Sequence, residues 1–235
     1  MKSLLNSHNF GKEELLQYCF YLQNYCVNEI NDRAKGPQNQ NYYRNEYLTW
    51  VDFKAANGLL LVRGYIPHTD FKNFISCSLK CLPLNAARAQ NFYSQQVAHL
   101  ELTFAAETAA FCQANIWFSE GKYKKCYDLL LKHQFADPFN KTDAKILEIK
   151  ALYELNETDP FESVLNNAIR YLFRLKMLPA ARLTALKNML NFLKRMYETD
   201  PANQKRLRAM KTQLLGMTVV ADKDWLLEKI TDLII

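Results

Sequence analysis

Residues 107–140 have the sequence ETAAFCQANIWFSEGKYKKCYDLLLKHQFADPFN, which predicts two helices joined by a tight turn. The turn is expected at Gly121, because glycine is favoured just past a helix end. Pro138 is expected to stop the second helix. Apolar side chains recur at helical spacing on both sides of the turn: Ala110, Ala114 and Trp117 before it, and Tyr123, Cys126 and Leu130 after it. Such a hairpin cannot bury both of its faces alone, so the stretch predicts neighbours of the same kind.

The composition of the chain favours helices throughout. It has 235 residues, of which 49% are hydrophobic and 13% aromatic, enough for a substantial core. The chain contains only 6 glycines and 7 prolines, and the many turns of an all-β protein require more of these turn-forming residues. We therefore predict an all-α protein.

The remaining sequence divides into further helices. Helices are predicted at 12–33 and 42–63, separated by a loop at 35–41 that contains the helix breakers Gly36 and Pro37. Four helix pairs follow, with first helices that begin roughly 34 to 39 residues apart. These pairs are 69–82 with 86–98, 103–119 with 122–133, 142–155 with 160–176, and 179–198 with 201–215. A last helix, capped by Asp222, is expected to cover the final pair.

The domain organisation follows from these elements. We predict an N-terminal helical pair at 1–66 that belongs to the same stack, four hairpins at 67–216, and a C-terminal capping helix at 217–235.

The stretch 107–140 resembles the tetratricopeptide repeat family. With Glu107 at the first position of a repeat, the matching residues are Trp117 at the large aromatic position, Gly121 and Tyr123 in the Gly-x-Tyr turn, Cys126 at the small-residue position, and Pro138 at the closing proline. The resemblance extends over 67–216 as architecture, although the next unit has no Gly-x-Tyr.

This resemblance implies a right-handed stack of antiparallel helical hairpins, an α-solenoid whose first helices line a concave peptide-binding groove. Carried over by position, the groove residues are Thr108, Phe111, Asn115 and Phe118 in the best repeat and Thr142, Lys145, Ile149 and Leu152 in the next. Phe111, Phe118 and Leu152 would be apolar anchors, and Lys145 would favour an acidic partner.

A run of basic residues is the clearest functional signal. Residues 163–197 contain no acidic side chain and seven basic ones: Arg170, Arg174, Lys176, Arg182, Lys187, Lys194 and Arg195. One interpretation is a solvated surface whose long side chains cover the stack. The other is a binding surface for an acidic peptide or for RNA phosphates, with Tyr171, Phe173, Phe192 and Tyr197 available to stack on bases or, as their helical spacing favours, to pack in the core.

We predict no catalytic, cofactor-binding or metal-binding site. The sequence lacks the glycine-rich nucleotide motifs and the Gly-x-Ser-x-Gly elbow. Cys77 and Cys81 lie four residues apart without a second ligand pair, so the six cysteines are expected to be reduced core residues of a cytoplasmic protein. The longest aliphatic run, Leu59 to Val62, is far too short to span a membrane.

We therefore predict a non-catalytic helical-repeat scaffold that binds a peptide or helix of another protein in a groove formed by 103–119, 142–155 and 179–198. Arg170, Arg174 and Arg182 would contribute to the selection of acidic partners. The alternative is an RNA-binding helical repeat that uses the basic surface at 170–211. The net charge of +6 is compatible with both. The sequence specifies neither the partner nor the oligomeric state.

Overall fold

The computed structural model describes residues 10–32, 36–82 and 85–234, and within them the protein is all-α, as predicted. Two isolated β-bridges, Val62 with Tyr65 and Ile66 with Leu100, supplement the helices in this part of the chain. The helices are α2 (Lys12–Asn31), α3 (Gly36–Ala56), α4 (His68–Lys80), α5 (Ala86–Gln96), α6 (Leu102–Ser119), α7 (Tyr123–Lys132), α8 (Pro138–Glu154), α9 (Thr158–Arg174), α10 (Ala180–Tyr197), α11 (Gln204–Gly216) and α12 (Lys223–Asp232), with a 3-10 turn at Val97–His99. Among the described residues, none of these helices has the length and apolar character needed to cross a membrane.

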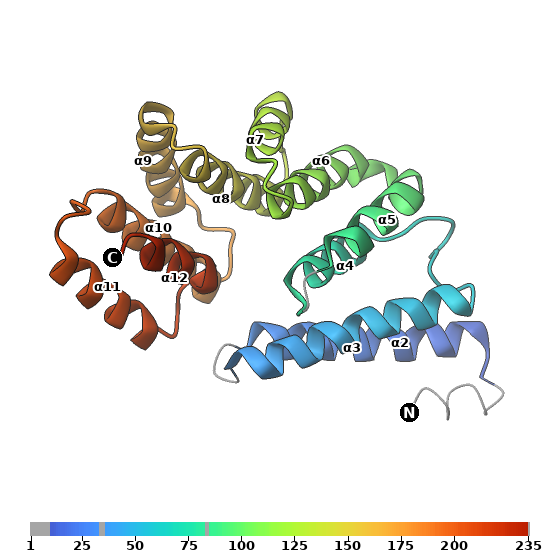
Figure 1. The fold of residues 1–235 in the computed structure, drawn as a ribbon. Coiled ribbons are helices and arrows are strands. Elements are labelled where there is room, and N and C mark those ends of the chain that lie inside the picture. Colours follow the sequence, from blue (N-terminus) through green and yellow to red (C-terminus); the bar gives the residue numbers. More distant parts are fainter. Residues whose placement is uncertain (1–9, 33–35, 83–84, 235) are drawn as a thin grey trace. The chain divides into compact units, whose positions relative to one another are not determined.

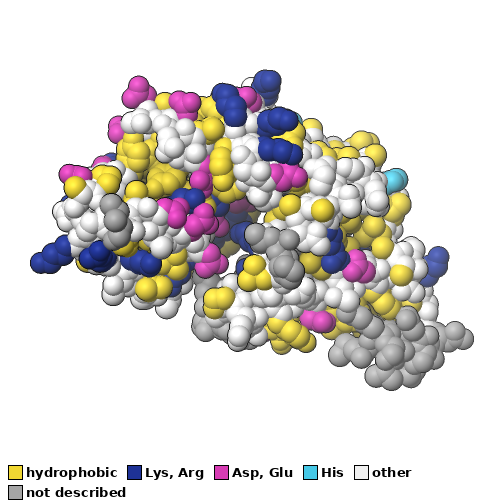
Figure 2. All heavy atoms as spheres, in the orientation of Figure 1, with side chains coloured by type: hydrophobic (Ala, Val, Ile, Leu, Met, Phe, Trp, Pro, Cys, Tyr) yellow, Lys and Arg dark blue, Asp and Glu magenta, His cyan; other side chains and the backbone are white. Residues whose placement is uncertain are grey.

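The chain forms two compact units, Met1–Phe135 and Ala136–Ile235, referred to below as unit 1 and unit 2. Helices α2 to α7 belong to unit 1 and α8 to α12 to unit 2 (Figure 1). Helices that follow one another in sequence pack as neighbours within both units. Both units expose positively and negatively charged side chains (Figure 2). The division falls inside the 67–216 block that the sequence predicts as consecutive hairpins.

The predicted loop at 35–41 is wrong for the residues that the structure describes, because α3 already begins at Gly36. Pro37 is the second residue of this helix. Proline is well tolerated in a first helical turn, where its missing N–H has no partner to lose and its fixed φ suits the helix. Lys35 lies outside the described residues.

The end of α3 also differs from the prediction, at Ala56 rather than near residue 63. Gly58 has a φ of 66°, in the left-handed region. The N–H of Leu59 donates to the carbonyl of Lys54 over 2.7 Å, and this closing bond terminates the helix.

Helix α8 begins at Pro138, four residues before the predicted start at Thr142. Asp137 is the N-cap, and its Oδ1 accepts a 2.8 Å hydrogen bond from the N–H of Asn140. Pro138 therefore opens α8 in addition to following the end of α7. Of the turn predicted between α4 and α5, Pro83 and Leu84 lie outside the described residues, and Asn85 caps α5.

The turn at Gly121 forms as predicted, and a matching turn follows one repeat length later. Gly121 has a φ of 71°, and the N–H of Lys122 donates to the carbonyl of Trp117 over 2.8 Å. After α8, Asn156 has a φ of 55°, and the N–H of Glu157 donates to the carbonyl of Leu152 over 3.2 Å. Asparagine thus replaces the glycine that the Gly-x-Tyr pattern requires, since it also tolerates this conformation.

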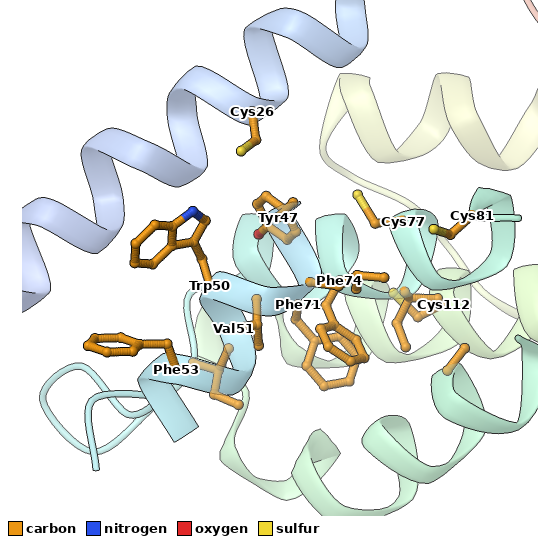
Figure 3. Packing of buried hydrophobic residues seen from close by; sticks show 14 of the residues in the cluster. Cys26, Tyr47, Trp50, Val51, Phe53, Phe71, Phe74, Cys77, Cys81 and Cys112 are labelled. Carbon is orange, nitrogen blue, oxygen red and sulfur yellow. The ribbon is translucent and has the colours of Figure 1, made fainter. Parts of the chain in front are cut away.

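The core of unit 1 lies between α2, α3, α4 and α6. Figure 3 shows side chains from these helices meeting in one cluster, with Trp50 and Tyr47 facing the helix that carries Cys26. Five of the six cysteines belong to this cluster, in agreement with their predicted place in the core: Cys19, Cys26, Cys77, Cys81 and Cys112.

A buried lysine interrupts this apolar core. Lys54 on α3 is only 1% exposed, and its Nζ lies 3.0 Å from Oδ2 of Asp70 on α4 and 3.2 Å from Oε1 of Gln23 on α2. The ammonium also lies 4.6 Å from the ring centroid of Phe20. One cation therefore connects three helices, since a buried charge must be paired and hydrogen-bonded.

We predict that Asp70→Asn destabilises the protein more than Lys54→Met. The first substitution leaves a buried ammonium without its counter-charge and should lower the free energy of unfolding by about 3 to 5 kcal/mol. The second leaves a carboxylate that is 21% exposed and can remain hydrated, so we expect its cost to be at least about 1 kcal/mol smaller. Urea unfolding, monitored by circular dichroism, measures the free energy of unfolding of both variants. A larger loss for Lys54→Met than for Asp70→Asn would contradict the role assigned to Lys54.

We also predict opposite effects for alanine at two glycines. Gly121→Ala should destabilise by about 1 kcal/mol, because L residues are strained at positive φ. Gly216→Ala, in α11 and outside the positive-φ region, should be neutral or stabilise by up to about 1 kcal/mol. An added Cβ meets no atom within 4 Å at either position among the described residues, so urea unfolding reports the backbone effect alone. Equal effects at both positions would contradict this account.

Candidate functional site

Of the four predicted groove residues of α6, Thr108 is fully buried, and the other three share one helical face and each already have a contact within unit 1. The ring centroid of Phe111 lies 5.0 Å from Nζ of Lys72 on α4. The Asn115 side chain donates to the carbonyl of Phe111 over 2.9 Å, and the ring of Phe118 lies 5.1 Å from that of Tyr123. All three side chains are half-buried and contribute to packing within unit 1.

Three of the four predicted groove residues of α8 are buried inside unit 2 and do not lie on an exposed face of that helix: Thr142, Ile149 and Leu152. Lys145 is half-buried, with its Nζ 5.7 Å from the ring centroid of Tyr171 on α9. The cause is that α8 packs against α9 and also receives α12, from the C-terminal end of the chain.

Polar contacts hold α12 on α8. Oε1 of Glu154 accepts from Nε1 of Trp225 over 2.7 Å, and Oε2 lies 3.1 Å from Nζ of Lys229. Burial alone would lower the pKa of Lys229, but hydrogen bonds to Glu228 and Glu154 outweigh it, and the pKa is raised. Lys229 therefore remains charged, and α12 contacts α8 in addition to α10 and α11.

Asp222 precedes α12 but does not act as the predicted side-chain cap within the described residues. Its backbone is left-handed, with a φ of 44°, and its Oδ2 lies 2.9 Å from Nζ of Lys150 on α8. The carboxylate thus supports the α8–α12 contact instead of the helix end.

The basic residues of 163–197 do not share one environment. Arg182, at the start of α10, forms an ion pair with Asp143 and stacks near Phe139 on α8, so its charge is compensated within unit 2. Arg195 donates to Gln213 on α11 over 3.0 Å. Arg170 and Arg174 are exposed on α9. Of the three arginines predicted to select partners, Arg170 and Arg174 are therefore placed on the surface, whereas Arg182 connects helices.

A basic surface with exposed apolar side chains extends along α9 and α10. Nζ of Lys187 on α10 lies 4.5 Å from the ring centroid of Phe173 on α9, and Nζ of Lys194 lies 3.1 Å from Oδ1 of Asn166. Phe173 is 65% exposed and Met177, just beyond α9, is 68% exposed. We define the α9–α10 face as Asn166, Arg170, Phe173, Arg174, Met177, Lys187 and Lys194. Within this face, Nζ of Lys194 lies 3.7 Å from Oε1 of Glu198.

Three of the four aromatic residues in the basic run pack internally, as their spacing favoured. Phe192 is buried, the ring of Tyr197 lies 4.6 Å from that of Phe161, and Tyr171 is half-buried beneath Lys145. Phe173 is the exception among these four. The sequence analysis did not identify Met177, although it follows Phe173 at the same four-residue interval as Arg174 follows Arg170.

No group of three or more His, Cys, Asp or Glu side chains in the part of the chain that the structure describes could hold a metal ion. Burial raises the pKa of Cys77 and of Cys112 to about 12, against smaller opposing effects of Arg44 and Lys72 respectively. These thiols are therefore protonated and inaccessible at neutral pH.

Comparisons with protein-family models, curated proteins and solved structures found no significant match to this chain.

We predict that none of the six cysteines reacts rapidly with a thiol reagent in the native protein at pH 8. All six are free and buried, and reaction requires an accessible thiolate. Titration with Ellman's reagent should show slow, unfolding-limited reaction without denaturant, and six thiols in guanidinium chloride as the control. A stoichiometric burst in the native protein would contradict the packing described for the core.

Proposed function

We propose that the protein is a non-catalytic helical scaffold that binds an acidic segment of another protein through the α9–α10 face. The observation that carries this proposal is the exposure of Phe173 and Met177 among basic side chains. Large apolar side chains at a surface are typical of binding sites when they lie together and are bordered by polar groups.

The chemistry of the face suits a peptide with both acidic and apolar residues. Arg170 and Arg174 can form charge-assisted, bidentate hydrogen bonds with carboxylates. Met177 is flexible enough to fit different apolar side chains, and Phe173 supplies a rigid apolar surface. Lys187, 4.5 Å from the Phe173 ring, adds positive charge beside this anchor.

The same observations favour a protein partner over RNA. Proteins that bind single-stranded RNA stack successive bases on several aromatic side chains. On the α9–α10 face Phe173 is the aromatic member, while Tyr171, Phe192 and Tyr197 are engaged in packing.

We further propose that α6–α7 and α8–α9 are repeated hairpins of tetratricopeptide type. Support comes from the matching motif at 107–140 and from the same left-handed turn after α6 and α8, with Gly121 in one and Asn156 in the other. In this proposal the ligand lies on the α9–α10 face and not on the positions of α8 that the resemblance implies.

The test uses a capped peptide of alternating aspartate and leucine. Arg170→Glu with Arg174→Glu should weaken its binding at least about tenfold, or about 1.4 kcal/mol, because two attractive charges become repulsive. The matched control is Lys205→Glu with Arg206→Glu, which makes the same charge change on exposed positions of α11 and should preserve binding. Fluorescence anisotropy measures the affinity, and circular dichroism verifies the fold of each variant.

Equal losses in both double variants would show a non-specific charge effect and contradict the proposed face. A uridine oligonucleotide is the second probe. Tighter binding of this probe, with a steep loss between about 50 and 200 mM salt, would support the RNA-binding alternative instead.

A further inference from the structure

Unit 2 contains a pocket of about 220 Å³ where the α8–α9 turn, the α10–α11 turn and the end of α12 meet. Its deepest lining residues are Leu152, Phe161 and Met196, each at most 1% exposed. Leu233 and Pro201 also line it, one from the end of α12 and one from the α10–α11 turn. The lining is thus mainly apolar and is formed by four helices and their turns.

The one charged residue that lines this pocket within the described part of the chain is acidic, and further acidic residues adjoin the lining in the sequence. Glu157 lines the pocket and is exposed. Three further exposed carboxylates directly adjoin lining residues in the sequence: Asp159, Asp200 and Asp232. Figure 2 shows a hydrophobic area of unit 2 between α9 and α12 that Asp and Glu side chains border.

Two basic groups close in sequence to the pocket are engaged elsewhere. Lys229 contacts Glu154, Glu228 and Asp232, and Arg195 donates to Gln213 on α11. A positive charge on a ligand in the pocket would therefore meet the carboxylate of Glu157, which lines it.

We propose that this pocket binds a bulky aliphatic side chain of a partner segment whose flanking residues are basic. The volume supports a side chain as the occupant, because pockets for whole small-molecule ligands measure roughly 300 to 1,000 Å³. The carboxylate of Glu157 selects the flanking charges. This site is separate from the α9–α10 face, carries the opposite charge, and does not depend on the function proposed above.

The test uses three capped tripeptides, Arg-Leu-Arg, Arg-Ala-Arg and Glu-Leu-Glu, titrated into the full chain and followed by NMR chemical shifts. Arg-Leu-Arg should bind at least about tenfold more tightly than the other two and shift the amides of Glu157, Thr158 and Thr199. Equal affinity of Arg-Ala-Arg would overturn the use of the pocket, and equal affinity of Glu-Leu-Glu would overturn the role of Glu157. Absence of Arg-Leu-Arg binding at millimolar concentration would overturn the proposal as a whole.

Two variants test the same site from the protein side. Glu157→Lys should weaken Arg-Leu-Arg binding, and its matched control is Asp224→Lys, which makes the same charge change at an exposed position in the first turn of α12.

Thr158→Trp should fill the pocket mouth and weaken binding, whereas Thr184→Trp on α10 should not. Circular dichroism establishes that each variant is folded. Arg170→Glu with Arg174→Glu should leave Arg-Leu-Arg binding unchanged, which separates failure of this site from failure of the α9–α10 face.

Discussion

The contact of Glu154 with Trp225 and Lys229 is the constraint on which the arrangement of unit 2 depends. It attaches the last helix of the chain to the first helix of the unit. Leu152 lies in the interior of the unit, where α8 packs on α9. The contact of Glu154 places Leu233 at the pocket where the two interhelical turns meet. One carboxylate, half-buried beside a charged lysine and an indole N–H, thereby attaches the last described helix to α8.

Unit 2 consequently presents two surfaces of different chemistry. The α9–α10 face combines exposed apolar side chains with basic residues, and the pocket combines an apolar interior with exposed carboxylates. In the functions proposed here, partners are distinguished mainly by charge, since apolar anchors alone discriminate poorly and like charges at an interface are costly. A scaffold with both surfaces could hold an acidic and a basic segment at once.

Unit 1 depends on a different interaction, the buried Lys54 that faces Asp70 and Gln23. A single charge in an apolar core restricts how α2, α3 and α4 can be arranged, because every other arrangement leaves the ammonium unpaired. Aromatic, cysteine and aliphatic side chains form the surrounding core. From α6, Cys112 and Ile116 belong to this core.

The sequence by itself determined the helices, because apolar periodicity and capping residues act over one or two turns. Gly121 shows this directly, and even the errors at Pro37 and Pro138 concern local turn chemistry, where a proline can begin a helix as well as end one. The sequence also located the basic run. Only the tertiary structure decided that Arg182 is paired with Asp143, that Leu152 is buried and that Phe173 is exposed. The physical reason is that exposure depends on which distant helix covers a side chain, and local periodicity does not reveal the contact between α8 and α12, which are far apart in sequence.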